Sequence, residues 1–552
     1  MRQIDVIKVY EKKSCLIVDD LPEVRGTVKR MMQSLGVKKI DTAADADEAM
    51  VMCESRPYGL VLCDYNLGKS KDGQQLLEEL RFMSKLPYTT LFIMITAESS
   101  REMVLGAIEN QPDDYITKPI APSHLSKRLD RALLKHQDLY DIKEAIDAKN
   151  FRRAVDLCSE KIEAGHKFTL DCKRYKAQLL TSLEDFEPAA EIYQSVLNER
   201  SLVWAQIGLA RIKMQDPSGY DEAEEILHSV IAVDSRYIEA YDLLSQIEKQ
   251  KNNIDEAQAF TLRATQLSPK SILRYRRLAT LAELNNDNLT CLSAYQSAIR
   301  WNHNSCYAKA DDYLNLARTT IPLVAGLKDR NSVDKAKSAL SMLDRMRKRF
   351  PHEEKHVRAQ LLECQLHTGQ GKIDLGKSMA EQAESAFKAL ENPNIETRFD
   401  FVTSQLTCGS KQEANKELYL MARQYKNDNT VLERIDKLSD EPISLAGKKC
   451  AAELSRSGIN AYKNKNYDDA LKIFTDALCL YPNHTGLNLN LVQAALAKTN
   501  DLGPDERLDQ LCVQCIRRVG ELGEDNAQFT RFDFLLKQHA KLYGNDNCTQ
   551  SV

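Results

Sequence analysis

The sequence predicts two fold classes in one chain: an α/β domain with a doubly wound, five-stranded parallel sheet, followed by an all-α superhelix of helical repeats. Three observations support this prediction. Up to about residue 120, short apolar runs alternate with amphipathic stretches, as strands alternate with helices. From residue 138 on, the apolar period is helical throughout, and part of it recurs every 34 residues. Glycine (21) and proline (15) are sparse for 552 residues, as expected of a mostly helical chain.

Composition and charge exclude several classes of protein. With 43% apolar and 28% charged residues, the chain can bury a core, so it is not disordered. Its 14 cysteines are scattered, and its charged first residues lack the apolar stretch of a secretory signal, which predicts a reducing cytoplasmic location. No apolar run approaches the roughly 20 residues of a membrane helix. A net charge of −4, with no basic half, predicts no nucleic-acid partner.

Five apolar runs rich in Val, Ile, Leu or Thr predict the strands of the α/β domain. They are residues 15–20, 39–44, 59–64, 90–96 and 114–119. The stretches between them predict helices, of which residues 22–35 and 74–83 have the clearest apolar stripes. Strands alternating with helices imply a parallel sheet that is covered on both faces. In such sheets the functional site lies at the carboxyl ends of the strands.

Five polar or charged residues stand at the carboxyl ends of four of these strands. Asp19 and Asp20 end the first predicted strand, Asp64 ends the third, Thr96 the fourth and Lys118 the fifth. Three carboxylates at one edge repel each other unless a cation lies among them, and an all-oxygen set suits Mg²⁺. A lone Asp-Asp pair is more often structural, but this combination at the strand ends is specific. The sequence therefore predicts a magnesium site at this edge.

This constellation resembles the receiver domain of bacterial two-component response regulators, a flavodoxin-like fold, over about residues 12–136. The resemblance implies that Asp64 is the phospho-acceptor and that a sensor histidine kinase is the donor. It also implies that Asp19, Asp20, Asp64 and the backbone carbonyl of Asn66 hold Mg²⁺.

The resemblance assigns roles to five side chains besides the three aspartates. Thr96 would hydrogen-bond the phosphoryl group and Lys118 would form a charge-assisted bond to it, which suits a transfer that depends on positioning and positive charge. Tyr115 matches the aromatic switch whose rotamer follows the Thr96 hydroxyl. Asn66 and Glu98 match the polar pair that fast-cycling chemotaxis-type receivers carry two residues beyond the acceptor and the threonine. This pair predicts a short-lived phosphoryl group.

The loop after Asp64 departs from the family pattern. Gly68 takes the place of a proline, and Gly73 falls nine residues after the acceptor where eight is usual. The loop is thus one residue longer, but it has lost no ligand. We interpret the difference as a change of loop shape that affects the choice of partner.

The segment after Pro122 has a helical apolar period without glycine or proline as far as residue 150. One interpretation is a single rigid helix that continues from the receiver into the next domain and transmits its switch. The alternative is two helices with a bend. The sequence does not choose between them.

The repeats downstream have a period of 34 residues, with small residues where paired helices would touch. This pattern resembles the tetratricopeptide repeat (TPR). Its positions in two successive units are Tyr241, Leu244, Ser245, Ala257, Thr261, Ala264 and Pro269, then Tyr275, Leu278, Ala279, Cys291, Tyr295, Ala298 and His303. A later unit has Gly458, Ala470, Phe474, Ala477 and Pro482. Other copies are looser, and the spacing leads us to expect eight to ten units.

The predicted domains follow from these patterns. They are a receiver over 1–136, TPR-like repeats over 137–305, degenerate helical repeats over 306–450 and TPR-like repeats over 451–552. Such arrays present an extended concave face that suits peptides or helices of partner proteins. The alternative is that the repeats are only a rigid spacer.

Two motifs resemble metal sites but are interpreted otherwise. His352 to His356 (HEEKH) matches the zinc-peptidase pattern, but its flanks are strongly charged and no third ligand stands out, so it is interpreted as the solvated first turn of a helix. Cys512 and Cys515 form a CxxC without the second pair that a zinc ribbon requires, which favours core residues. No other catalytic signature is found, so the chemistry expected is the receiver's own phosphotransfer and dephosphorylation.

The sequence thus favours a cytoplasmic response regulator in which phosphorylation of Asp64 gates protein binding by the array. A phosphate sink that modulates a kinase without a switched output is an alternative. A transcriptional regulator is less favoured, because no helix-turn-helix stands out and residues 137–552 are net acidic. The sequence leaves open a homodimer, the identity of the kinase and the target.

Overall fold

The computed structural model describes residues 6–68, 71–96, 112–303, 305–327, 329–520, 522 and 526–544. The chain divides into two compact units, Met1–Leu323 and Val324–Val552. None of the helices in the described residues combines the length and the apolar character that crossing a bilayer needs.

The first unit begins with a short helix, α1 (Val6–Lys12), and a parallel sheet of five strands in the order β2-β1-β3-β4-β5. The strands are β1 (Ser14–Val18), β2 (Lys39–Ala43), β3 (Leu60–Asp64), β4 (Leu91–Thr96) and β5 (Asp114–Thr117). All residues of the central strands β3 and β4 are buried, because helices cover both faces. The predicted α/β class, a doubly wound parallel sheet of five strands, is confirmed.

Each face of the sheet has its own helices and its own core. On one face, α3 (Ala46–Ser55) and α4 (Gly73–Phe82) pack on alternate strand residues such as Val61 and Phe92. On the other face, α2 (Pro22–Ser34) and α6 (Pro122–Asp138) pack on the strand residues between them. The period of two along each strand therefore divides the apolar side chains between two cores.

The segment after Pro122, which connects the receiver to the repeats, forms two helices with a break between them. Helix α6 ends at Asp138 and α7 (Tyr140–Asp147) follows, with Leu139 between them at φ −106° and ψ 10°. Asp147 at the end of α7 accepts hydrogen bonds from the backbone amides of Tyr88 (2.6 Å) and Thr89 (2.9 Å) and from the Thr89 hydroxyl (2.7 Å). The second helix is thus tied back to the receiver loop that precedes β4.

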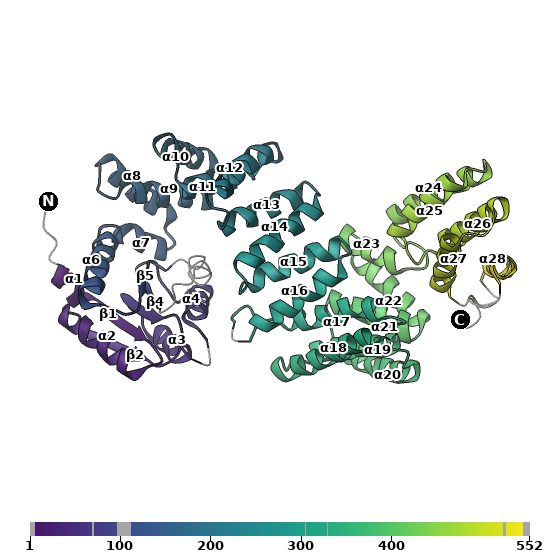
Figure 1. Ribbon diagram of the computed structural model, residues 1–552, viewed down its shortest axis with the longest axis horizontal. Coiled ribbons are helices and arrows are strands. Elements are labelled where there is room, and N and C mark those ends of the chain that lie inside the picture. Colours follow the sequence, from purple (N-terminus) through teal and green to yellow (C-terminus); the bar gives the residue numbers. More distant parts are fainter. Residues whose placement is uncertain are drawn as a thin grey trace. The chain divides into compact units, whose positions relative to one another are not determined.

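The rest of the first unit is a run of antiparallel helices that pack on their neighbours in sequence (Figure 1). They are α8 (Phe151–Glu163), α9 (Thr169–Ser182), α10 (Phe186–Glu199), α11 (Val203–Lys213), α12 (Tyr220–Val233), α13 (Ile238–Gln250), α14 (Ile254–Leu267), α15 (Ile272–Leu284), α16 (Asn288–Trp301) and α17 (Ala310–Val324). The small residues of the repeat, such as Ala257, Ala264 and Ala298, are fully buried where helices meet. This agrees with the predicted role of small residues in close helix approach.

Gly208 in α11 is a sensitive point of this packing. A Cβ atom placed on Gly208 would lie 2.3 Å from ring atoms of Tyr193 in α10. We therefore expect Gly208→Ala to lower the free energy of unfolding by about 1–3 kcal/mol, because the buried ring has to move. Urea unfolding of the full chain measures this. The control is Gly26→Ala in α2, where nothing lies within 4 Å of the added atom; a loss of stability there as large as at Gly208 would contradict the explanation.

The second unit is helical throughout its described residues. Its helices are α18 (Arg330–Arg349), α19 (Glu353–Gly369), α20 (Ile373–Ala389), α21 (Ile395–Cys408), α22 (Lys411–Gln424), α23 (Asn429–Leu438), α24 (Leu445–Lys463), α25 (Tyr467–Leu480), α26 (Thr485–Leu502), α27 (Glu506–Val519) and α28 (Phe529–Tyr543). Gly458 in α24 faces the ring of Phe474 in α25, as Gly208 faces Tyr193 in the first unit. A glycine against an aromatic ring thus recurs in both units.

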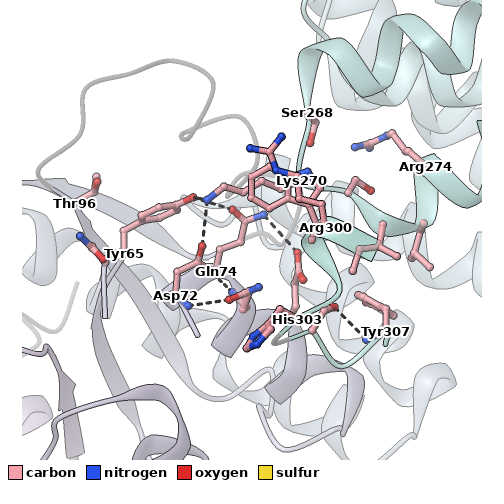
Figure 2. A pocket seen from close by; sticks show the side chains of 18 of the residues that line it. Tyr65, Asp72, Gln74, Thr96, Ser268, Lys270, Arg274, Arg300, His303 and Tyr307 are labelled. Atoms are coloured by element: carbon pink, nitrogen blue, oxygen red, sulfur yellow. Dashed lines mark hydrogen bonds and ion pairs between the residues drawn. The ribbon is translucent and has the colours of Figure 1, made fainter. Parts of the chain in front are cut away.

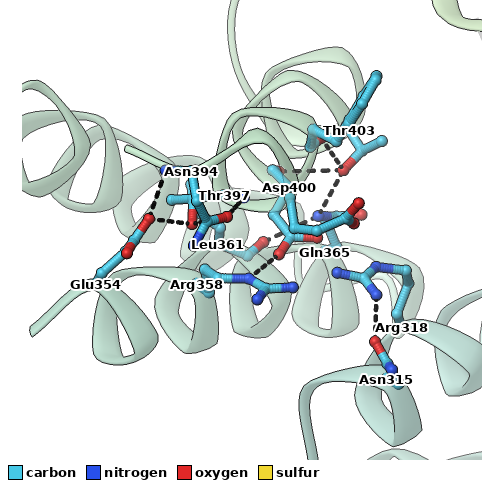
Figure 3. A network of polar contacts seen from close by, with 12 residues as sticks. Asn315, Arg318, Glu354, Arg358, Leu361, Gln365, Asn394, Thr397, Asp400 and Thr403 are labelled. Atoms are coloured by element: carbon cyan, nitrogen blue, oxygen red, sulfur yellow. Dashed lines mark hydrogen bonds and ion pairs between the residues drawn. The ribbon is translucent and has the colours of Figure 1, made fainter. Parts of the chain in front are cut away.

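A polar network joins α19 to α21 (Figure 3). Arg358 donates from Nε to Asp400 Oδ2 at 2.7 Å, and both side chains are only 2% exposed. Glu354 accepts hydrogen bonds from the Asn394 amide (2.7 Å) and the Thr397 hydroxyl (2.8 Å). Glu354, which stands at a variable position of the HExxH pattern, therefore holds the start of α21.

The residues of the histidine and cysteine motifs also have structural roles: the histidines lie at the start of α19 and the cysteines lie in a core. His352 is the N-cap residue of α19, and His356 Nε2 lies 3.1 Å from the backbone carbonyl oxygen of Phe350. Cys512 and Cys515 in α27 are buried in the apolar core of the second unit. The two cysteines are core residues, as the sequence suggested.

Candidate functional site

The order of the strands brings the predicted site residues together. Strands β1 and β3 are neighbours, so Asp19, which follows β1, lies beside Asp64 at the end of β3. Strands β3 and β4 pair with Asp64 opposite Ile95, which places Thr96 one residue beyond, and β4 pairs with β5 just before Lys118. Asp19, Asp64 and Thr96 are 3%, 6% and 4% exposed. The carboxyl edge is therefore a nearly buried polar site.

Lys118 balances part of the negative charge at this edge. Its Nζ lies 2.9 Å from Asp19 Oδ2 and 2.9 Å from Asp64 Oδ2. Burial by itself lowers the pKa of Lys118, but the hydrogen bonds to Asp19 and Asp64 outweigh it and raise the pKa. Burial raises the pKa of Asp64 against the opposing effect of Lys118, and the charges of Asp19 and Asp20 add to the rise. The Asp64 carboxylate is thus short of compensating positive charge.

The acidic side chains fit a hard divalent cation. One carboxylate oxygen from each of Asp19, Asp20 and Asp64 lies within 4.8 Å of the other two. Among the residues that the structure describes, this is the one group of three or more histidine, cysteine or acidic side chains so arranged. An all-oxygen set of this kind suits Mg²⁺ and does not suit softer metals.

The loop after the acceptor is closed by its last glycine. The Gly73 amide donates to the Tyr65 carbonyl oxygen at 2.8 Å, and a Cβ on Gly73 would lie 2.2 Å from the carbonyl oxygen of Asp64. Asp72 caps α4 by accepting from the Gln75 amide at 2.8 Å. Only glycine fits at position 73. The extra loop residue therefore moves this glycine one position along the sequence, and its close packing against the backbone of Asp64 is kept. Gly68, at φ +83°, occupies a conformation that favours glycine.

Tyr115 on β5 packs against the core that α3 and α4 cover. Its hydroxyl is buried without a hydrogen-bond partner among the described residues. Burial, with a smaller contribution from the neighbouring Tyr65, raises the pKa of Tyr115 well above its usual value. Glu98, the other residue of the predicted tuning pair with Asn66, lies outside the described residues.

The sequence did not reveal that the site opens into a cavity of about 910 Å³ that helices of the array help to form (Figure 2). The receiver side of this cavity includes Asp20, Asp64, Asn66, Thr96 and Lys118. The array side includes the basic residues Lys270, Arg274, Arg277, Arg300 and His303. Asp242, in the same wall, pairs with Arg274 at 2.7 Å and with Arg277 at 2.8 Å. No local signal could have identified these residues, because they lie some two hundred positions after Asp64.

Comparison with known proteins agrees with this geometry. Residues 15–130 match the response regulator receiver domain family, and residues 238–271 match the tetratricopeptide repeat. Over 116 residues the chain is 32% identical to chemotaxis protein CheY-3 of Vibrio cholerae, a match that covers 21% of this chain and 88% of that protein. Over 127 residues it is 32% identical to the probable transcriptional regulator ycf27 of Cyanophora paradoxa, covering 23% of this chain and 50% of that protein. The solved structure of Vibrio cholerae chemotaxis protein CheY4 at low pH is 27% identical and covers 22% of this chain and 97% of that one, with a TM-score of 0.20.

The two matched segments coincide with the two architectures of the fold. The first runs from β1 into α6 and contains the acidic edge, and the second spans α13 and α14. Both predicted resemblances are therefore confirmed. The chain belongs to the response regulators of two-component systems, with a receiver domain at residues 15–130 that is followed by tetratricopeptide-type repeats.

Proposed function

We propose that Asp64 accepts a phosphoryl group from a sensor histidine kinase and that this phosphorylation gates the binding of a protein target by the helical array. The observation that carries the proposal is the convergence of Asp19, Asp20, Asp64 and Lys118 at the mouth of a cavity that the array shares. We place the protein in the cytoplasm, where such kinases present their phosphohistidine.

The transfer needs a nucleophile, in-line access and positive charge on the phosphoryl oxygens. An Asp64 oxygen forms the new P–O bond while the P–N bond of the phosphohistidine breaks, which leaves an acyl phosphate on the chain. In this structure Lys118 pairs with both Asp19 and Asp64, so its ammonium group is close enough to form an ion pair with a phosphoryl group on Asp64. Mg²⁺, when held by Asp19, Asp20, Asp64 and the carbonyl of Asn66, supplies the remaining neutralisation.

Thr96 and Tyr115 are the proposed switch. The Thr96 hydroxyl stands at the end of β4 beside the acceptor strand and would hydrogen-bond the phosphoryl group. The buried hydroxyl of Tyr115 has no partner among the described residues, so an inward shift of Thr96 can change the balance between its rotamers. Asn66 and Glu98 would orient a hydrolytic water and keep the phosphoryl group short-lived. Beyond this phosphotransfer and dephosphorylation we assign the chain no enzymatic reaction.

Amide hydrogen exchange of the full chain, with and without beryllofluoride and Mg²⁺, tests the gating. Beryllofluoride mimics the phosphoryl group, so we expect it to change exchange by severalfold in α13 to α16 as well as in the receiver. Asp64→Asn is the control and should remove the difference, because it removes the ligand of the mimic. If the change were confined to residues 12–136, the array would not be gated, and a phosphate sink would be the better account.

A further inference from the structure

The turn between α14 and α15 contacts the receiver next to the acceptor (Figure 2). Lys270 in this turn donates from Nζ to the Tyr65 hydroxyl at 2.9 Å and to Asp72 Oδ2 at 3.2 Å. The same ammonium group stands over two aromatic rings, at 5.2 Å from the centroid of Tyr65 and 5.9 Å from that of Trp301. One lysine of the array thus makes an ion pair, a hydrogen bond and a cation–π contact with the receiver.

The receiver residues that Lys270 contacts enclose the acceptor loop. Tyr65 directly follows Asp64, and Asp72 is the N-cap of α4, whose first residue, Gly73, donates its amide to the Tyr65 carbonyl oxygen at 2.8 Å. At the other end of α4, the ring of Phe82 packs edge-on against Tyr307, with the centroids 5.4 Å apart. The array therefore holds both ends of the helix that starts beside the acceptor.

This contact covers the mouth of the phosphorylation site but does not fill it. The cavity of about 910 Å³ that remains between Asp64 and the basic residues of the array is the size of a small-molecule site. An α-helix with its side chains is about 10–12 Å across, and a phosphohistidine is carried on a helical bundle, which is far larger than this cavity. A small phosphodonor can therefore enter while Lys270 holds the cover closed, whereas a helical donor cannot.

We propose that the Ser268–Ser271 turn is a built-in cover that selects among phosphodonors, with Lys270 as the residue that holds it shut. Small anionic acyl phosphates reach Asp64 through the cavity, past a wall that carries Arg300 and His303. A protein phosphodonor reaches Asp64 only after the contacts of Lys270 with Tyr65 and Asp72 have opened. The proposal rests on the assignment of Asp64 as acceptor.

The test compares two donors on the full chain. One is acetyl phosphate, and the other is a phosphorylated histidine-kinase core that labels the wild-type chain. Lys270→Ala removes a charge-assisted contact, so we expect it to raise the initial rate of labelling by the kinase core about tenfold and to leave the rate with acetyl phosphate within about twofold. Lys270→Arg keeps the charge and should behave like the wild type.

Two further variants separate the cover from a general effect. Asp72→Asn weakens the same contact from the receiver side while asparagine still caps α4, so it should also speed labelling by the kinase core. Lys251→Ala is the matched control: Lys251 also lies in a turn of the array and pairs at 2.7 Å with Asp221 and at 2.7 Å with Glu224, without contacting the receiver. It should leave both rates unchanged.

Different outcomes would contradict the cover and the proposed function. An equal change with both donors, or no change with either, would overturn the cover while leaving Asp64 as acceptor. Labelling of Asp64→Asn by both donors at the wild-type rate would instead refute the proposed function, because Asp64 would then not be the acceptor. Thermal unfolding of Lys270→Ala close to that of the wild type excludes misfolding as the cause, and Asp72→Asn provides an independent reading if the first variant is unstable.

Discussion

Asp64→Asn is expected to abolish labelling of the chain by acetyl phosphate in the presence of Mg²⁺. The amide has nearly the shape of the carboxylate but is no nucleophile, so it cannot form the acyl phosphate. It also removes one of the three carboxylates that lie within 4.8 Å of one another. Loss of the attacking group should lower the rate by at least about 10³-fold. Phosphate-affinity gels or radiolabelled donor measure the rate directly.

The control for this experiment is Asp47→Asn. Asp47 is an exposed carboxylate of α3 that pairs with Lys71 at 2.9 Å and does not line the cavity. The same change of charge in the same domain should therefore leave labelling unchanged. Undiminished labelling of Asp64→Asn would show that another residue is the acceptor, and the assignment of the whole edge would have to be revised.

Asp400→Ala is expected to lower the free energy of unfolding of the second unit by about 3–5 kcal/mol, because it leaves Arg358 buried and charged without this carboxylate. The two side chains are 2% exposed and 2.7 Å apart, so water cannot replace the lost partner. Urea unfolding, together with amide exchange in α19 and α21, measures the loss. The combined variant Arg358→Met, Asp400→Leu removes both charges and should recover most of the stability.

An exposed ion pair in the same unit is the matched control. Arg434 in α23 pairs with Glu396 in α21 at 2.6 Å, and both side chains are exposed. Glu396→Ala should therefore cost no more than about 1 kcal/mol. Equal losses at Glu396 and Asp400 would contradict the view that burial makes the Arg358–Asp400 pair sensitive.

The sequence predicted the receiver closely because its signals are local. Each strand is a short apolar run that ends in a polar residue, and parallel strands must bring such ends to one edge. Asp19, Asp64 and Lys118 therefore come together in the structure as their positions along the chain implied. The repeats were equally visible, because small residues such as Ala257 and Ala264 recur at a fixed period and are buried at helix contacts.

Other features needed the folded chain. The two interpretations of the connector differ by one residue, Leu139, whose backbone breaks the helix without glycine or proline to signal it. Gly73 looked like a displaced family glycine, and only its closeness to the Asp64 carbonyl shows why glycine stands there. The Arg358–Asp400 pair joins two helices whose charged residues, in sequence, look like solvated faces.

By itself, the sequence thus determined the sheet, the acidic edge and the repeat period of this protein, since each depends on spacings of a few residues. Only the tertiary structure decided that Lys270 lies against Tyr65, which is 205 positions earlier in the chain. The physical reason is that such a contact depends on the summed angles between successive helices of the array. Each angle is set by side-chain packing between neighbouring helices, and no local pattern of residues records their sum.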